Sequence, residues 1–150
     1  MRYAEWKNSI EGVRYNLWVC GVRSNSDEEN ALIIAKTLLK LPRKVREKVL
    51  DQVCFIIAGE AQGTVFKFQF NEPQPIGKTL FFILLNFAEM KQDSEDDKMR
   101  TVAHEIAHFI LGHDALIDSG GEKEADDLIE KWGFKRIYQS YGRFDTEKKE

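Results

Sequence analysis

Apolar residues recur at helical spacing in two consecutive stretches of the first third of the chain. Ser26 and Glu29 have the spacing of a capping box, and the apolar positions that follow are Ala31, Leu32, Ile34, Ala35, Leu38 and Leu39. Pro42 ends this helix and can start a second one, whose apolar stripe consists of Val45, Val49, Leu50 and Val53. Residues 1–25 fit a strand and a helix equally well, so their structure stays open.

After residue 52 the spacing of apolar residues changes to one that is typical of β-strands. Residues 53–59 are almost wholly apolar, and residues 64–70 alternate phenylalanine with polar side chains after a glycine-containing turn. This pattern predicts a hairpin with one face in water. A loop with Pro73 and Pro75 then leads to a third strand at residues 80–87, which is apolar on both faces and is therefore expected to be buried.

Two more helices are predicted in the last third of the chain. The first begins after Ser94, whose spacing from Asp97 fits an N-terminal cap, and ends at Gly112, a residue type that favours the left-handed C-cap conformation. The second begins near Glu122, and residues 136–150 are expected to form a polar tail. The order of helix, helix, three strands, helix and helix predicts a single α+β domain with a small antiparallel or mixed sheet.

Composition narrows the function classes. The chain has 150 residues, a net charge of −3 and no basic face, which argues against direct nucleic-acid binding. Cys20 and Cys54 lie far apart in the sequence and are expected to be free thiols. The N-terminus lacks the apolar core of a signal peptide, and the longest apolar run, residues 79–88, is too short to cross a bilayer. We therefore expect a cytoplasmic protein with no membrane partner.

The three histidines of the chain lie within ten residues of one another, and two of them occur in the sequence His-Glu-x-x-His. His104 and His108 are four residues apart, so on a helix both imidazoles can bind one metal ion. Glu105 lies about 100° round the helix and can reach a metal-activated water without being a ligand. The segment is apolar almost all round, and buried histidines are costly unless paired or metal-bound. A zinc site is therefore favoured over a structural histidine pair.

A zinc ion held by two histidines needs at least one more protein ligand. The candidates are the acidic and histidine side chains that follow the motif: His113, Asp114, Asp118, Glu122, Glu124 and Asp126. Glu122 and Glu124 both flank the apolar stripe of the last helix, so periodicity does not choose between them. Glu122 also has a competing role, because its spacing from Ser119 fits a capping box.

A metzincin-like site would use Asp114, which lies six residues after His108. That arrangement requires glycine at a position that Leu111 occupies here, and the glycine comes one residue later. Gly112 instead fits an ordinary helix C-cap. His113 is then expected to be a helix-end histidine favoured by the helix dipole, and the least favoured histidine for contact with zinc.

The third ligand is indicated by a resemblance. The motif His104-Glu105-x-x-His108, followed by Glu122-x-x-Ala-Asp126, resembles the gluzincin metallopeptidases, most of all the short minigluzincins. The match covers residues 42–134, and it extends to repressor-cleaving and membrane-bound HExxH peptidases, although this chain lacks the transmembrane helices of the latter. The resemblance implies a compact zincin-like α+β domain with a three-stranded sheet, an active-site helix and a glutamate helix.

The same resemblance implies a function and a set of roles. Zn²⁺ would be bound by His104, His108 and Glu122, with Glu105 as the general base and Asp126 as the carboxylate behind a ligand histidine. The implied enzyme is a zinc metalloendopeptidase that hydrolyses a peptide or protein substrate. Minigluzincins also imply a latent form, in which a terminal segment of the chain masks the zinc.

Two other functions remain open. The protein could bind zinc without cleaving anything, as a regulatory or interaction protein, although the intact Glu105 argues against a dead site. Structural zinc would require a fourth ligand such as His113 or Asp114. A peptidase also needs a strand to pair with its substrate, for which the third strand with Asn86 is expected, and an oxyanion donor. The candidate donors are Tyr138, Tyr141, Arg136 and Arg143.

Overall fold

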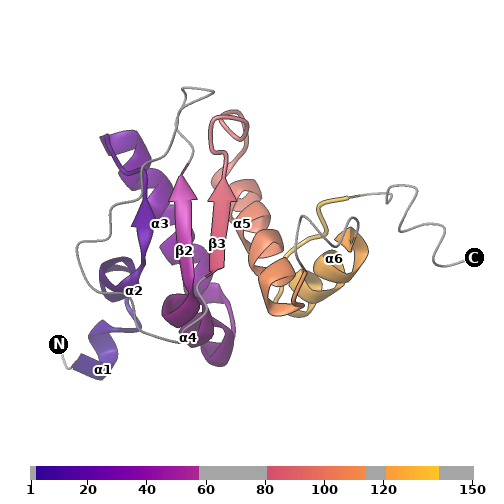
Figure 1. The fold of residues 1–150 in the computed structure, drawn as a ribbon, viewed down its shortest axis with the longest axis horizontal. Coiled ribbons are helices and arrows are strands. Elements are labelled where there is room, and N and C mark those ends of the chain that lie inside the picture. Colours follow the sequence, from indigo (N-terminus) through magenta and orange to yellow (C-terminus); the bar gives the residue numbers. More distant parts are fainter. Residues whose placement is uncertain (1–2, 58–80, 114–120, 139–150) are drawn as a thin grey trace, which may run out of the picture.

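A parallel sheet of three strands lies at the centre of the fold. The computed structural model describes residues 3–57, 81–113 and 121–138. Within these ranges the strand order is β1 (Val19–Cys20), β2 (Val53–Ile57) and β3 (Phe81–Leu85). Figure 1 shows the three strands side by side, with helices packed around them. The predicted α+β class is confirmed.

The expectation of an antiparallel or mixed sheet is wrong for the described strands. Between β1 and β2 the chain forms α3 (Asn25–Lys40) and α4 (Arg43–Gln52), and a helical crossover of this kind returns the chain to the end of the sheet from which it started. β2 and β3 pair in parallel as well. The strand predicted at residues 64–70, and with it the hairpin, lies outside the described residues.

The first 25 residues contain both of the structures that their pattern allows. After the short α1 (Tyr3–Trp6), the chain forms α2 (Ile10–Asn16) and then β1. The next helix, α3, begins two residues earlier than predicted, because Ser24 rather than Ser26 is its N-cap: the Ser24 hydroxyl accepts a hydrogen bond from the Asp27 backbone N–H at 3.1 Å. The second predicted helix is confirmed as α4, with Pro42 at its N-cap position.

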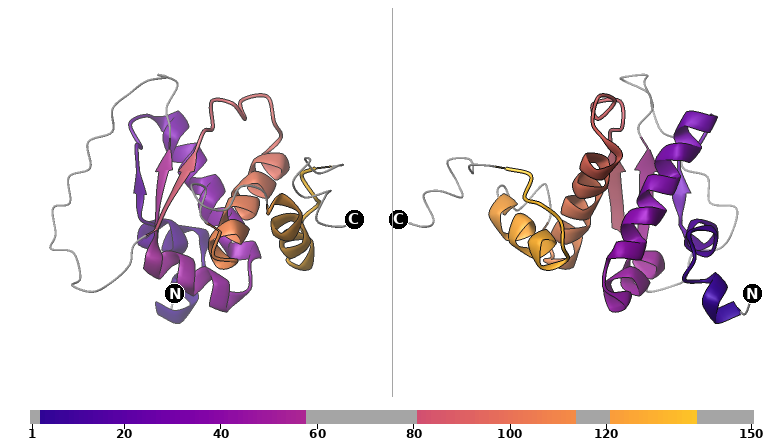
Figure 2. Two further views of the ribbon diagram at one scale, coloured as in Figure 1. Left: turned by 45° about the vertical axis from the view of Figure 1, so that its right-hand side comes forward. Right: turned by 180° about the vertical axis from the view of Figure 1, so that it is seen from behind.

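Helices cover one face of the sheet. Figure 2 shows α3 and α5 (Glu95–Ile110) against this face, and α6 (Glu122–Lys131) on the side of α5 that is remote from α3. The buried core joins α2, α3 and α5 to the residues of β2 that face them, which are Val53, Phe55 and Ile57. None of the helices in the described ranges is both long enough and apolar enough to cross a membrane.

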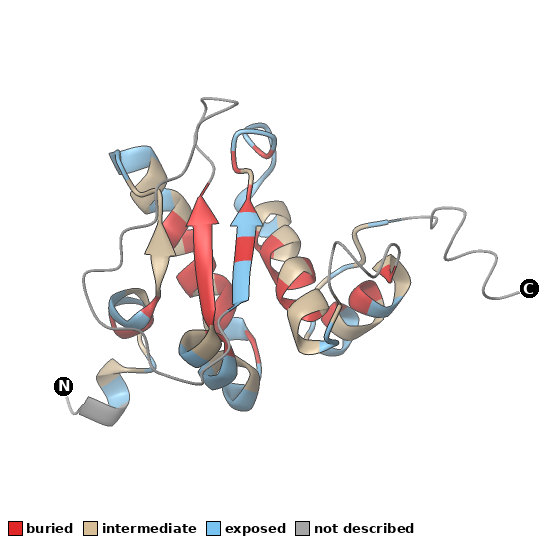
Figure 3. Cartoon of the chain, viewed as in Figure 1, coloured by how far each residue is buried: buried red, intermediate tan, exposed pale blue. Residues whose placement is uncertain are grey.

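The prediction that the third strand is buried on both faces is wrong. Ile83 and Leu85 point into the core, but Phe82 and Leu84 on the opposite face are 50 % and 59 % exposed. Figure 3 shows the contrast between β3, where buried and exposed residues both occur, and β2, which is buried throughout. Apolar composition could not reveal this difference, because it does not specify which faces of a strand are covered.

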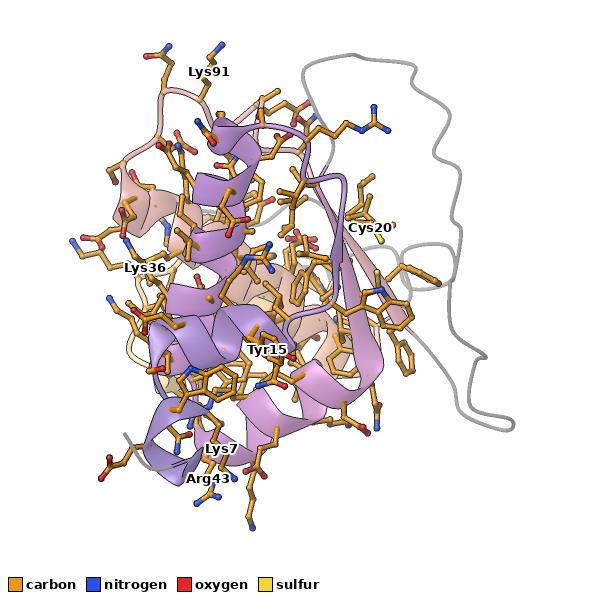
Figure 4. All side chains as sticks on the ribbon, turned by 90° about the vertical axis from the view of Figure 1, so that its left-hand side faces the viewer. Lys7, Tyr15, Cys20, Lys36, Arg43 and Lys91 are labelled. Carbon is orange, nitrogen blue, oxygen red and sulfur yellow. The ribbon has the colours of Figure 1, made fainter. Side chains whose placement is uncertain are left out.

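The two cysteines are free thiols, as predicted. They lie on neighbouring strands, with Cys20 Sγ 3.6 Å from Cys54 Sγ. Figure 4 shows the Cys20 side chain pointing to the side of the sheet away from α3. The cysteines are therefore separated from the histidines, which lie on α5 on the covered face of the sheet.

Candidate metal site

The two helices that carry the predicted ligands pack directly on each other. α5 begins as predicted, with the Ser94 hydroxyl accepting a hydrogen bond from the Asp97 backbone N–H at 3.2 Å. Small and aliphatic residues form the contact between α5 and α6: Ala103, Ala107, Ala125 and Ile129, all fully buried. Alanines at a helix contact allow close approach of the two backbones. This approach places the first residue of α6 beside the last two turns of α5.

His104, His108 and Glu122 converge on one point. The Nε2 atoms of the two imidazoles are 3.1 Å apart. Glu122 reaches both of them, with Oε2 2.7 Å from His104 Nε2 and Oε1 3.4 Å from His108 Nε2. Ligand atoms around a tetrahedral zinc ion are separated by about 3.3 Å, given metal–ligand bonds of about 2 Å. The donor set and its spacing therefore fit a divalent metal ion.

Burial favours the neutral form of the histidines, which is the form that can bind a metal. His104 is only 2 % exposed, and His108 is partly buried. Burial, together with the charge of His104, lowers the pKa of His108, and this effect outweighs the opposing charge of Glu122. An imidazole must be neutral to bind a metal through its nitrogen lone pair. The surroundings of His108 thus hold it in the form that binds a metal.

Glu105 lies next to the converging side chains without belonging to them. Its side chain is partly buried, and burial raises its pKa, with a decrease from the charge of His104 and a further increase from the negative charge of Glu122. A carboxylate with a raised pKa is a stronger base than an exposed one. These surroundings suit the proton-transfer role expected from the sequence, which remains a prediction.

Asp126 occupies the position expected of it, behind a ligand histidine. Its side chain is fully buried, and Oδ1 lies 2.9 Å from His104 Nδ1. The same carboxylate accepts hydrogen bonds from the backbone N–H groups of Ile137 and Tyr138, each at 3.2 Å. Asp126 therefore connects α5, α6 and the chain segment that follows α6. A carboxylate at this nitrogen fixes the tautomer in which Nε2 is free to bind a metal.

His113 lies closer to the candidate site than its sequence position indicated. Its Nδ1 is 2.9 Å from His108 Nδ1, on the edge of the His108 ring that faces away from Glu122. The turn at Gly112 brings it there: Gly112 has a φ of 75°, as the predicted C-cap requires, and the His113 backbone N–H donates to His108 O at 2.9 Å. The signal in the sequence was Gly112, because a glycine C-cap turns the chain back over the last turn of a helix and so brings the next residue, His113, towards His108.

The other candidates for the third ligand are not part of this group. Among the residues that the structure describes, His104, His108 and Glu122 are the one group of three or more possible ligands whose ligand atoms all lie within 4.8 Å of one another. Glu124 is exposed on the surface of α6. Asp114 and Asp118 fall outside the described ranges. Ser119 does too, and with it the predicted capping box of Ser119 and Glu122. In the structure α6 follows Gly121, which has a φ of 78°.

One of the four expected oxyanion donors lies next to the candidate site. The ring of Tyr138 is centred 5.8 Å from the His104 ring. Burial and the charges of Glu122 and Glu105 raise the pKa of Tyr138. Arg136 instead pairs with Asp127 and Glu130. Tyr141 and Arg143 lie outside the described residues.

Comparison with known proteins adds no assignment. No family model, no curated protein and no solved structure matches the chain. The chemistry and geometry of the residues described above are therefore what indicates a function for this chain.

Proposed function

We propose that this chain is a zinc-dependent metallopeptidase of the gluzincin type, with a zincin-like fold. The observation that carries the proposal is the convergence of His104, His108 and Glu122, with Glu105 beside them and Asp126 hydrogen-bonded to His104. Two imidazoles and one carboxylate are the protein ligands of many catalytic zinc sites, which leave a position for water. When bound, zinc supplies Lewis-acid activation of that water and of the scissile carbonyl group.

The residues of the chain then have separate tasks. His104, His108 and Glu122 hold the metal, and Asp126 keeps the Nδ1 proton of His104 in place so that Nε2 remains a ligand. Glu105 accepts the proton of the attacking water and transfers it to the leaving amine. Of the expected oxyanion donors, Tyr138 is the one whose described position supports the role.

Tyr138 also bears on the expected latent form. The segment that contains it passes over His104 and is hydrogen-bonded to Asp126, so it could mask the metal as well as assist the reaction. Removing residues 1–25 is a poor test of masking, because Val13 and Leu17 belong to the core. Two variants separate the roles: Tyr138→Phe removes only the hydroxyl and lowers activity if that group is a hydrogen-bond donor, whereas Tyr138→Ala removes the ring and raises activity if the ring is a mask.

The decisive experiment measures zinc content and hydrolysis of a broad peptide library for the full chain and for Glu105→Gln. We expect the wild-type chain to bind zinc and cleave peptides, and Glu105→Gln to keep zinc while losing about 10²- to 10⁴-fold in rate. Glu124→Gln, an exposed position on α6, is the matched control and should retain both properties. Zinc binding without cleavage by any of these proteins would indicate the non-catalytic alternative, and no zinc binding would refute the metal site.

A further inference from the structure

The two histidines of the candidate site have different partners at their outer nitrogens. A neutral imidazole carries one N–H, so a histidine that binds metal through Nε2 has its proton on Nδ1 and needs an acceptor there. For His104 this acceptor is the buried Asp126 carboxylate. His108 Nδ1 faces His113 Nδ1 instead, at 2.9 Å. A contact this short between two nitrogens requires that one of them carries a proton and the other accepts it.

We infer that His113 is a positioning residue that orients His108 for metal binding. His113 accepts the His108 Nδ1 proton through its own Nδ1 and keeps its proton on Nε2. The direction of the hydrogen bond follows from the metal site, because His108 Nε2 must be free of a proton to bind zinc. The inference therefore rests on the proposed function, and it adds a residue to which the HExxH and ExxAD motifs assign no role.

Two glycines make room for this arrangement. Gly112 turns the chain at the end of α5, so that His113 folds back over the last turn of the helix. Gly121 lies against the His113 ring next to the nitrogen that contacts His108: a Cβ atom built there would be 2.6 Å from Cε1 and 2.8 Å from Nδ1 of His113. Any larger residue before Glu122 would displace the ring from His108. The His113 imidazole thus occupies the space that a side chain at position 121 would need.

The test compares zinc affinity, measured by chelator competition, with the visible absorption spectrum of the Co²⁺-substituted protein. His113→Phe keeps the ring volume but removes the acceptor, and His113→Ala removes it without adding an apolar ring. His113→Asn places an amide oxygen near the position of Nδ1. We expect the Phe and Ala variants to bind zinc about 10- to 100-fold more weakly with an altered Co²⁺ spectrum, and the Asn variant to recover most of both. Leu111→Ala, at an exposed site on the same helix end, is the control.

The outcomes separate this inference from the proposed function. Unchanged zinc affinity in the Phe and Ala variants would overturn the positioning role while leaving the metal site intact. An equal loss in the Phe, Ala and Asn variants would also overturn it, since it would point to direct metal binding by His113 or to a purely structural role. Absence of zinc binding by the wild-type chain would refute the proposed function itself. Unfolding curves recorded in EDTA show whether each variant folds.

Discussion

Asp126→Ala tests whether one buried carboxylate connects the candidate site to the rest of the fold. Asp126 is fully buried and accepts three hydrogen bonds, from His104 Nδ1 and from the backbone N–H groups of Ile137 and Tyr138. Alanine removes the acceptor and leaves the three donors in place. The cost depends on which of these donors water can reach.

The donor that determines the magnitude is His104. Its side chain is 3 % exposed, so its N–H would be left without a partner and out of reach of water. A hydrogen bond to a charged group contributes about 1.5–3 kcal/mol, and leaving a buried neutral donor unsatisfied costs about 1–3 kcal/mol. Ile137 and Tyr138 are only partly covered, so water replaces part of their loss. We therefore expect Asp126→Ala to lower the free energy of unfolding by about 1.5–3 kcal/mol.

The neighbouring residue provides a matched control. Asp127 pairs with Lys123 and Arg136 at 2.7 Å each, but its side chain is 42 % exposed, and exposed ion pairs contribute less than about 1 kcal/mol. Urea unfolding in EDTA, followed by circular dichroism, measures both variants without any metal contribution. A loss below about 1 kcal/mol for Asp126→Ala, or equal losses for Asp126→Ala and Asp127→Ala, would refute the reasoning.

Two further predictions concern the sheet and the helix contact. Burial, followed by the hydrogen bond with Cys20, raises the pKa of the Cys54 thiol to about 12, so in the folded protein Cys54 should resist iodoacetamide at pH 8.5, as mass spectrometry would show. Because the folded state favours the protonated thiol, this contribution to stability is complete at lower pH and is lost as pH rises from the ordinary thiol value of 9.0 towards about 12. Ala125→Leu should overfill the contact between α5 and α6 and lower the unfolding free energy by about 1–3 kcal/mol. Glu124→Leu, at the exposed position directly before Ala125, is the control. It should change the unfolding free energy by less than about 0.5 kcal/mol in the same urea experiment.

The sequence predicted the local parts of the candidate site well. The spacing of His104 and His108, the cap at Ser94 and the turn at Gly112 each depend on residues within one or two helical turns, and the structure contains all of them. The choice between Glu122 and Glu124 was not accessible to periodicity, because both flank the same apolar stripe. It depends on how α6 lies against α5, which is a tertiary property.

The errors concern one local choice and two tertiary properties. Ser24 and Ser26 each precede an acidic residue by three positions, so the local pattern allows two caps, and the structure uses Ser24. The direction of the strands depends on the crossover through α3 and α4. The exposure of β3 depends on which of its faces the helices cover. For strand direction and for the exposure of β3, contacts between distant segments decided between alternatives that were locally equivalent.

Charge and helix direction both bear on the proposal that a cation binds between α5 and α6. His108 lies in the last turn of α5, where the helix dipole favours positive charge. Glu122 and Asp126 belong to the first half of α6, whose N-terminal end favours the carboxylates but opposes a cation. With Glu105 beside them, the two carboxylates bring the charge next to the two imidazoles to −3, most of which a divalent ion would neutralise. The negative end of α5 and these carboxylates thus offset the positive end of α6, which supports the divalent cation proposed for this position.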